Sequence, residues 1–271
     1  MKLKGKVALV LGAIKGIGKG IGIALAKEGA SVALNYFDWE ESLDEMKQDF
    51  AKTGQDHLII RTNLLETDKI PELIQQVVDH FGRLDILINN IERGGWPVVH
   101  GPYEREQWDL EMETTLRSKR WVFDSALPHL KASGDGIVIN LSSIAGIVGR
   151  SGPAGYIFND GYAAANRGIS LLTETWAREG APQVRVNEIM LGFVETRHGE
   201  KTMGWGLLSE EQKSSILDHT LLERIGVIED VVKTILFIIK DAPFMTGSVL
   251  RLDGGYVLGG EAMGPMPKGV L

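Results

Sequence analysis

Val7-Ala8-Leu9-Val10-Leu11-Gly12-Ala13-Ile14-Lys15-Gly16-Ile17-Gly18 joins a short apolar run to a cluster of three glycines. The apolar residues predict a buried strand, and the glycines open a segment with helical periodicity. Glycine is needed where a chain turns sharply and where backbone must approach a pyrophosphate closely. The N-terminus of the following helix would offer free N–H groups and a partial positive charge. Residues 12–18 therefore predict a phosphate-binding loop, the alternative being a purely structural turn.

On the C-terminal side of this loop, short apolar runs alternate with longer segments of helical period. The runs lack polar alternation, which is typical of strands buried on both faces. Strand–helix alternation implies right-handed crossovers and hence an α/β, doubly wound, seven-stranded parallel sheet with helices on both faces, a Rossmann fold. The expected strands are 6–11, 31–36, 57–61, 84–88, 136–141, 184–189 and 248–252, and the expected helices are 17–29, 39–53, 69–82, 104–132, 160–180 and 227–241.

No linker or internal repeat interrupts this pattern, so we expect residues 1–271 to form a single domain. Residues 197–225 break the alternation, and we expect them to cover the strand ends as a substrate lid. Near the C-terminus, the apolar run 235–239 is far too short to span a bilayer. We therefore expect a soluble, cytoplasmic protein.

Composition excludes several function classes. A net charge of −7 argues against nucleic acid or an anionic membrane as the main partner. The absence of cysteine excludes disulfides, thiolate catalysis and thiolate-held metals. The six histidines are far apart, and we expect no metal site. A small-molecule substrate is the expected partner.

Further motifs follow the glycine loop in a fixed order. They are Leu11-Gly12-Ala13-Ile14-Lys15-Gly16-Ile17-Gly18, Asn89-Asn90-Ile91-Glu92, Ile139-Asn140-Leu141-Ser142-Ser143, Tyr162-Ala163-Ala164-Ala165-Asn166, Leu191-Gly192-Phe193-Val194-Glu195-Thr196 and Leu252-Asp253-Gly254-Gly255. In sequence and order they resemble the TGxxxGIG, NNAG, serine-bearing strand, YxxxK, PGxxxT and DGG motifs of the short-chain dehydrogenase/reductase family. The resemblance covers nearly the whole chain.

This resemblance implies roles for individual residues. Tyr162 would donate a proton to a substrate carbonyl, and Ser143 would orient that carbonyl. The family's catalytic asparagine position falls on Thr115, and its lysine position falls on Asn166. The implied cofactor contacts are Gly12, Lys15, Gly16, Ile17, Gly18, Asn63, Leu64, Asn90, Gly192, Val194 and Thr196.

The chain departs from the family pattern around this site. An asparagine at 166 cannot supply the positive charge that lowers the pKa of the tyrosine. Glu92 replaces a glycine, while Leu11 and Leu191 replace a threonine and a proline. We expect these residues and Thr115 to face one cofactor-lined pocket.

The sequence favours NADP over NAD. The second strand ends at the uncharged Tyr36, and Lys15 occupies a loop position from which a cation could pair with a 2′-phosphate. Asp38 lies twenty residues after Gly18, a spacing that suits the ribose hydroxyl of NAD. The alternative is that Lys15 is merely solvated and that Asp38 caps the following helix.

Three functional hypotheses follow. The first is an NAD(P)-dependent oxidoreductase that acts on a carbonyl or an alcohol with an atypical and less efficient site. The second is a non-redox or regulatory protein that keeps the fold and the cofactor site, and the third is an assembly subunit paired with an active relative. We expect a homodimer or homotetramer, and Trp108, Trp121 and Trp176 could be core or interface residues.

Overall fold

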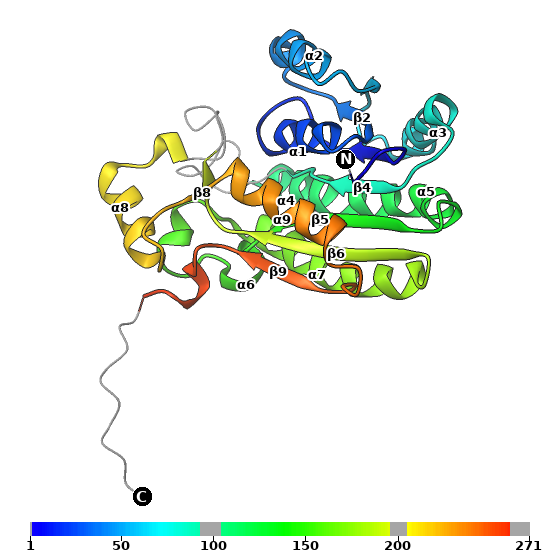
Figure 1. The fold of residues 1–271 in the computed structure, drawn as a ribbon. Helices are drawn as coiled ribbons and strands as arrows, with labels where there is room; N and C mark the ends of the chain where they lie inside the picture. The colour runs from blue at the N-terminus through cyan, green and yellow to red at the C-terminus, as the bar shows by residue number, and fades with distance from the viewer. Residues whose placement is uncertain (1, 93–103, 196–204, 261–271) are drawn as a thin grey trace, which may run out of the picture.

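The computed structural model describes residues 2–92, 104–195 and 205–260, and it contains a seven-stranded parallel sheet in the order β3-β2-β1-β4-β5-β6-β9 (Figure 1). This order reverses direction after β1, as in a doubly wound Rossmann sheet. All seven expected strands are confirmed, with ends that differ by at most two residues. The strands are β1 Val7–Val10, β2 Ser31–Tyr36, β3 His57–Arg61, β4 Ile86–Asn89, β5 Gly136–Ser143, β6 Val184–Leu191 and β9 Val249–Leu252.

Helices cover both faces of the sheet (Figure 1). Alternate residues of β1 enter two separate apolar clusters: Ala8 and Val10 pack with α1, α2 and α9, whereas Val7 and Leu9 pack with α3, α5 and α7. This two-sided burial explains why the strands are continuously apolar. The main helices are α1 Gly16–Lys27, α2 Leu43–Ala51, α3 Ile70–Phe81, α4 Arg105–Glu111, α5 Ser118–Ala132, α7 Asp160–Gly180 and α9 Ile228–Lys240.

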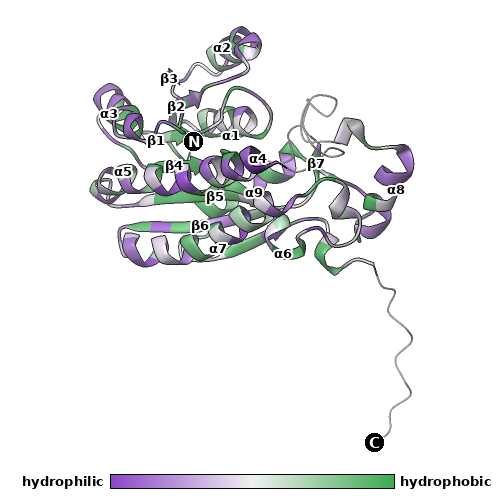
Figure 2. Cartoon of the chain, turned by 180° about the vertical axis from the view of Figure 1, so that it is seen from behind, coloured by the Kyte–Doolittle hydropathy of each residue, from purple (hydrophilic) through white to green (hydrophobic). Residues whose placement is uncertain are grey.

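Figure 2 shows the hydrophobic residues gathered on the strands and on the inward sides of the helices. The outward sides of the helices are mainly hydrophilic, which is the amphipathic pattern that predicted them.

The expected helix 104–132 is a composite. A π-helical segment, Met112–Arg117, separates α4 from α5. Hydrophobic periodicity did not predict it, because one wide turn changes the register of a helix without breaking it. The segment lies directly beneath the predicted site, where it carries Thr115.

The residues around the expected lid contain short elements that the sequence did not predict. Within 205–225 the chain forms a 3-10 turn at Trp205–Leu207 and helix α8, Glu210–His219, while residues 197–204 lie outside the described part of the chain. A two-stranded parallel pair joins β7 Val194–Glu195 to β8 Gly226–Val227. Helix α6, Ala145–Val148, and a 3-10 turn at Gly152–Tyr156 follow β5.

Among the described helices, none combines the length and apolar character of a membrane span.

Candidate active site

The glycine loop and Asn90 form a tight backbone cradle at the carboxyl edge of β1 and β4. Gly12 and Gly16 have positive φ angles of 62° and 56°. A Cβ atom on Gly12 would collide with the Asn90 carbonyl, and one on Gly18 would collide with the Gly12 carbonyl. Asn90 Nδ2 donates to the carbonyls of Leu11 and Gly12, at 3.3 and 3.2 Å. The loop therefore requires glycine for close backbone packing as well as for its turns.

Helix α1 begins at Gly16, directly after this cradle, and its first turn contains no acidic residue. The first N–H groups of a helix have no intrahelical acceptor, and the helix dipole favours an anion beside them. The residues present thus fit the diphosphate of a dinucleotide, with Gly12, Gly16, Ile17 and Gly18 placed to hold it.

The ends of β2 and β3, where the sequence predicts the adenosine of a cofactor, carry two cationic side chains. Lys15 Nζ lies 2.6 Å from the centroid of the Trp39 ring, so the interpretation of Lys15 as merely solvated is wrong. Trp39, not Asp38, occupies the N-cap position of the following 3-10 turn. Arg61 Nε donates to the carbonyl of Phe37 at 3.2 Å, which places a second cation near the end of β2.

Asn63 and Leu64 differ in what they can offer a cofactor. Asn63 Oδ1 accepts from Leu65 N, and Asn63 lines an open hollow together with Phe37 and Arg61. Leu64 is 7% exposed and packs into the apolar cluster of α3 and α5. The Leu64 side chain therefore belongs to the core, and the Leu64 carbonyl accepts a hydrogen bond from Ser118 Oγ at 2.8 Å.

The loop after β6 approaches the end of β9. Gly192 N donates to the Leu252 carbonyl at 2.9 Å, and a Cβ at Gly192 would lie 2.7 Å from the Cα of Asp253. Val194 belongs to β7 and pairs with Gly226. Thr196, the last residue expected to bind the cofactor, lies outside the described residues.

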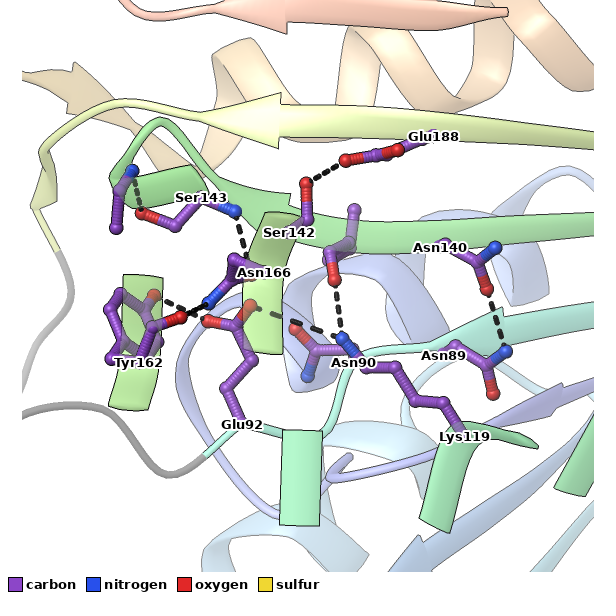
Figure 3. Close-up of polar contacts among 12 residues, drawn as sticks. Asn89, Asn90, Glu92, Lys119, Asn140, Ser142, Ser143, Tyr162, Asn166 and Glu188 are labelled. Atoms are coloured by element: carbon purple, nitrogen blue, oxygen red, sulfur yellow. Dashed lines mark hydrogen bonds and ion pairs between the residues drawn. The ribbon is translucent and has the colours of Figure 1, made fainter. Parts of the chain in front are cut away.

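Ser143, Tyr162 and Asn166 come together at the carboxyl end of β5 and the first turns of α7 (Figure 3). Asn166 Oδ1 accepts from Ser143 N at 2.9 Å, and Asn166 Nδ2 donates to the Tyr162 carbonyl at 2.9 Å. Asn166 is fully buried. The amide at the lysine position therefore ties the strand of Ser143 to the helix of Tyr162, and its two bonds go to backbone atoms.

The Tyr162 phenol is bound to a carboxylate. Tyr162 Oη donates to Glu92 Oε2 at 2.8 Å, and Glu92 Oε1 lies 3.9 Å from Lys119 Nζ. Lys119 reaches this point from α5 and donates to the Leu141 carbonyl at 2.6 Å (Figure 3). Its side chain is fully buried, whereas that of Glu92 is 22% exposed. The site thus contains a cation, but it reaches the phenol only through Glu92.

These neighbours set the protonation of the site. Burial raises the pKa of Tyr162 well above 10, and the Glu92 carboxylate raises it further, while a hydrogen bond with Ser143 opposes the shift. Burial raises the pKa of Glu92, and Lys119 and the Tyr162 phenol partly offset that rise. Burial likewise lowers the pKa of Lys119 against the attraction of Glu92 and Glu188. The phenol is therefore a weaker acid than a free tyrosine, the reverse of what an adjacent lysine would produce.

The five departures from the family pattern do not all face one pocket. Leu11 is fully buried in the cluster of α3 and α5, and Leu191 packs in the cluster of α1 and α9, so this expectation is wrong for both leucines. Apolar side chains at these positions gain more from the core than from a polar pocket. Thr115 is also fully buried, and its Oγ1 has no hydrogen-bond partner among the described residues. Only Glu92 and Asn166 contact Tyr162.

The sequence reasoning missed Lys119. A signal for it was present, because Lys119 shares a helix face with Val122, Phe123, Ala126 and Leu130, all of which are buried. A lysine on the apolar face of a helix must find a polar partner inside the protein.

An aromatic cluster adjoins the phenol. The Phe158 ring lies 5.7 Å from that of Tyr162 and stacks on Phe193 at 5.3 Å. Trp205 and Tyr256 extend the cluster from the far side of Phe193. This cluster gives the site an apolar wall beside its polar centre.

Comparison with known proteins identifies the family. A family model described as enoyl-(acyl carrier protein) reductase matches residues 12–257. The chain is 34% identical to the 3-oxoacyl-[acyl-carrier-protein] reductase FabG of Thermotoga maritima over 264 residues, covering 95% of this chain and all of that protein. It is 33% identical to the same-named reductase of Staphylococcus aureus strain Mu50, over 93% of this chain and 98% of that protein.

A solved structure from Sinorhizobium meliloti 1021, described as a short-chain alcohol dehydrogenase, superposes with a TM-score of 0.83. It is 28% identical, and the match covers 95% of this chain and 98% of that one. The order of the seven-stranded parallel sheet agrees with this similarity. The chain therefore belongs to the short-chain dehydrogenase/reductase family of NAD(P)-dependent oxidoreductases.

Proposed function

We propose that this protein interconverts a carbonyl and the corresponding alcohol, with Tyr162 as the proton-transferring residue. The observation that carries the proposal is the placement of the Tyr162 phenol and Ser143 at the same sheet edge as the glycine cradle. Ligands of open α/β sheets bind at this carboxyl edge. Reduced nicotinamide, when bound there, would supply a hydride.

Residues of the chain itself would donate the proton and orient the substrate carbonyl. Tyr162 gives a proton to the carbonyl oxygen, and the Ser143 hydroxyl, held by Ala145 N at 3.1 Å, orients that oxygen. Asn166 fixes Ser143 and Tyr162 relative to each other through its two buried hydrogen bonds. Because Asn166 carries no charge, we expect slower turnover than a lysine at this position would allow.

The most specific substrate class that we propose is a 3-oxoacyl thioester. Two similar proteins are named as reductases of 3-oxoacyl groups on acyl carrier protein, and the Phe158–Phe193 wall suits an acyl chain. Residues 197–225 would then close over the acyl chain as a lid. Within them, Ile216 of α8 already packs in the cluster that contains Tyr162 and Phe158.

For the cofactor we propose NADP. Tyr36 offers no carboxylate to repel a 2′-phosphate, and Lys15 and Arg61 are both near the end of β2.

Lys15→Ala should raise the KM for NADPH by about tenfold, which corresponds to the loss of one charge-assisted hydrogen bond. The KM for NADH should change by less than about twofold, since NADH has no 2′-phosphate. Equal changes for both cofactors would contradict the assignment of Lys15.

The decisive test of the reaction is Tyr162→Phe, assayed with NADPH and NADH on acetoacetyl thioesters and a carbonyl panel. We expect turnover to fall by at least about a thousandfold, because the substrate oxygen loses its proton donor. Tyr156→Phe is the matched control, since Tyr156 is 37% exposed and lies outside the site, and it should retain wild-type turnover. Unchanged turnover in Tyr162→Phe would refute the proposed role.

A second candidate is a non-redox protein that binds a dinucleotide. One observation favours it: burial and Glu92 raise the pKa of Tyr162, which opposes proton donation. This candidate predicts tight NADPH binding, seen by tryptophan fluorescence, with no hydride transfer to any carbonyl. Steady turnover on any member of the panel would exclude it.

We further propose that the protein is a homodimer or homotetramer assembled through α5 and α7. Trp121 on α5 is 46% exposed and Leu171 on α7 is 67% exposed, whereas Trp176 is buried in the core. Large apolar side chains left exposed on helices commonly mark an interface. Leu171→Glu should reduce the sedimenting mass, and an unchanged mass would contradict this surface.

A further inference from the structure

We propose that Glu92 is the group with which Tyr162 exchanges its proton, and that buried Lys119 is the counter-charge of Glu92. This inference rests on the proposed function, in which Tyr162 transfers a proton to a substrate. It assigns roles to two residues outside the family's catalytic set. Together they would replace the absent lysine by a different route.

The geometry that carries this inference is a chain of contacts from Lys119 through Glu92 to the Tyr162 phenol. Glu92 Oε2 accepts from Tyr162 Oη at 2.8 Å, and no group among the described residues donates a hydrogen bond to Glu92 Oε1. The Glu92 side chain is 22% exposed although its Oε1 atom is buried, whereas Lys119 is fully enclosed. A carboxylate that bonds to the phenol from a partly exposed side chain is suitably placed for a relay.

Lys119 supports Glu92 without competing for its proton. Its ammonium donates to the Leu141 carbonyl at 2.6 Å and lies 3.9 Å from Glu92 Oε1. At that separation the interaction is mainly coulombic, and it stabilises the ionised form of Glu92. Without Lys119, burial would favour the neutral acid more strongly. Lys119 is thus a positioning residue that sets the balance between the two forms.

The state of Glu92 decides where the phenolic proton points. When Glu92 is ionised, Tyr162 Oη donates to it, as in this structure, and the proton is directed away from the substrate. When Glu92 is protonated, it can donate to Tyr162 Oη, and the phenol can donate to a substrate oxygen. Reduction therefore needs the neutral acid, and oxidation needs the carboxylate.

The proposed steps balance in both directions. In reduction a hydride from reduced nicotinamide forms a C–H bond at the carbonyl carbon, and the carbonyl oxygen takes the Tyr162 proton. The phenol oxygen then takes the proton of Glu92, and the Glu92 carboxylate recovers a proton from water. In oxidation the alcohol proton passes to Tyr162, the phenolic proton passes to Glu92, and Glu92 releases a proton to water.

Other ionisable groups face this chain of contacts. Tyr162 lies in the field of Glu111 from α4, and Lys119 lies in the field of Glu188 from β6. Glu188 accepts hydrogen bonds from Ser142 and Ser170 and makes none with Tyr162. Glu188→Gln is therefore a matched control, because it removes a second buried carboxylate that lies outside the relay.

The first test follows the carboxylic acid bands of the unliganded protein by infrared difference spectroscopy as pH rises. We expect a band that persists above the pH at which ordinary carboxyls ionise, that is absent in Glu92→Gln and that remains in Glu188→Gln. Lys119→Met should shift the titration of this band to higher pH, since the ionised form loses its counter-charge. If Glu92→Gln leaves every band unchanged, Glu92 does not hold the proton and the inference is wrong.

The second test compares pH–rate profiles in both directions. In the wild type, reduction should decline and oxidation should increase as pH rises through the ionisation of Glu92. Glu92→Gln neither ionises nor transfers a proton, so the pH-dependent decline of reduction should disappear and both directions should become slower, oxidation by about a hundredfold. Glu188→Gln should keep both limbs.

The two tests separate this inference from the proposed function. A wild-type protein without turnover overturns the function, while the infrared titration still decides whether Glu92 holds a proton beside Tyr162. Turnover that depends on Tyr162, with the same pH profile in Glu92→Gln as in the wild type, overturns the relay alone.

Discussion

Asn166 illustrates how one residue can exchange a chemical role for a structural one. A lysine would direct its charge toward the site, but the Asn166 amide is buried and bonds to two backbone groups. An amide suits this position because it both donates and accepts. Asn166 therefore ties the strand of Ser143 to the helix of Tyr162, and among the described residues the buried cation nearest this site is Lys119, which faces Glu92.

Asn166→Ala should lower the free energy of unfolding by about 1 to 3 kcal/mol, because it leaves the buried Ser143 N–H without an acceptor. Urea denaturation would measure this loss. Arg167→Ala provides the control on the same helix, and because Arg167 is exposed its effect should stay within about 0.5 kcal/mol. Equal stability of the two variants would show that Asn166 does not tie β5 to α7.

The N-terminal turn of α7 positions the phenol of Tyr162. Asn159 is its N-cap, and Asn159 Oδ1 accepts from Tyr162 N at 2.8 Å. Asn159 Nδ2 donates to Glu111 Oε1 at 2.5 Å, which links α7 to the end of α4 just before the π-helical segment. The first turn of α7 is thereby held at both its backbone and its cap side chain.

Asn159→Ala should cost about 1 kcal/mol of stability, since an N-cap acceptor is lost. Because the same bond orients the turn that carries Tyr162, turnover should fall as well. Asn159→Ser keeps the cap oxygen and should recover most of the stability. Thermal melts and the acetoacetyl thioester assay would measure both effects, and a serine variant no more stable than alanine would contradict the capping role.

The elements were more predictable than the contacts between them. The apolar strands and the glycine loop follow from local patterns. The sheet could therefore be predicted from the first expected strand, 6–11, and the six later apolar runs. The structure brings Tyr162 and Ser143 together as the sequence predicted, while their chemical roles stay predictions. The contact of Glu92 with Lys119 could not be predicted, because it depends on how β4 packs against α5. The π-helical turn was missed because local periodicity tolerates one extra residue.

Two buried carboxylates of the described residues, Asp85 and Glu188, have pKa values shifted in opposite directions. Asp85 lies at the opposite edge of the sheet from the site and accepts from Val7 N at 2.9 Å and from Arg83 at 2.6 and 2.7 Å. Burial alone would raise the pKa of Asp85, but the hydrogen bonds from Arg83, Val7 N and Lys6 outweigh it and lower the pKa. Glu188, on β6 beside the edge strand β9, has its pKa raised by burial despite its bonds to Ser142 and Ser170.

These opposite shifts should give opposite dependences of stability on pH. A lowered folded-state pKa means that Asp85 stabilises the protein above its unfolded pKa, and that this contribution is lost as pH falls through the folded value. The raised pKa of Glu188 means that the folded state keeps a proton longer than the unfolded state does. The contribution of Glu188 is therefore present at low pH and is lost as pH rises from its unfolded value through its folded one.

Asp85→Asn should thus be destabilised by about 2 to 4 kcal/mol at neutral pH, with a smaller deficit in acid. Glu188→Gln, which keeps hydrogen-bonding capacity toward Ser142 and Ser170, should gain stability relative to the wild type as pH rises. Chemical denaturation of the three proteins from acid to mildly alkaline pH would measure both slopes. Parallel curves would mean that neither carboxylate titrates differently in the folded and unfolded chains. Slopes of the expected opposite signs would show that an ionised Asp85 stabilises the amino edge of the sheet, whereas Glu188 within β6 keeps its proton in the folded chain.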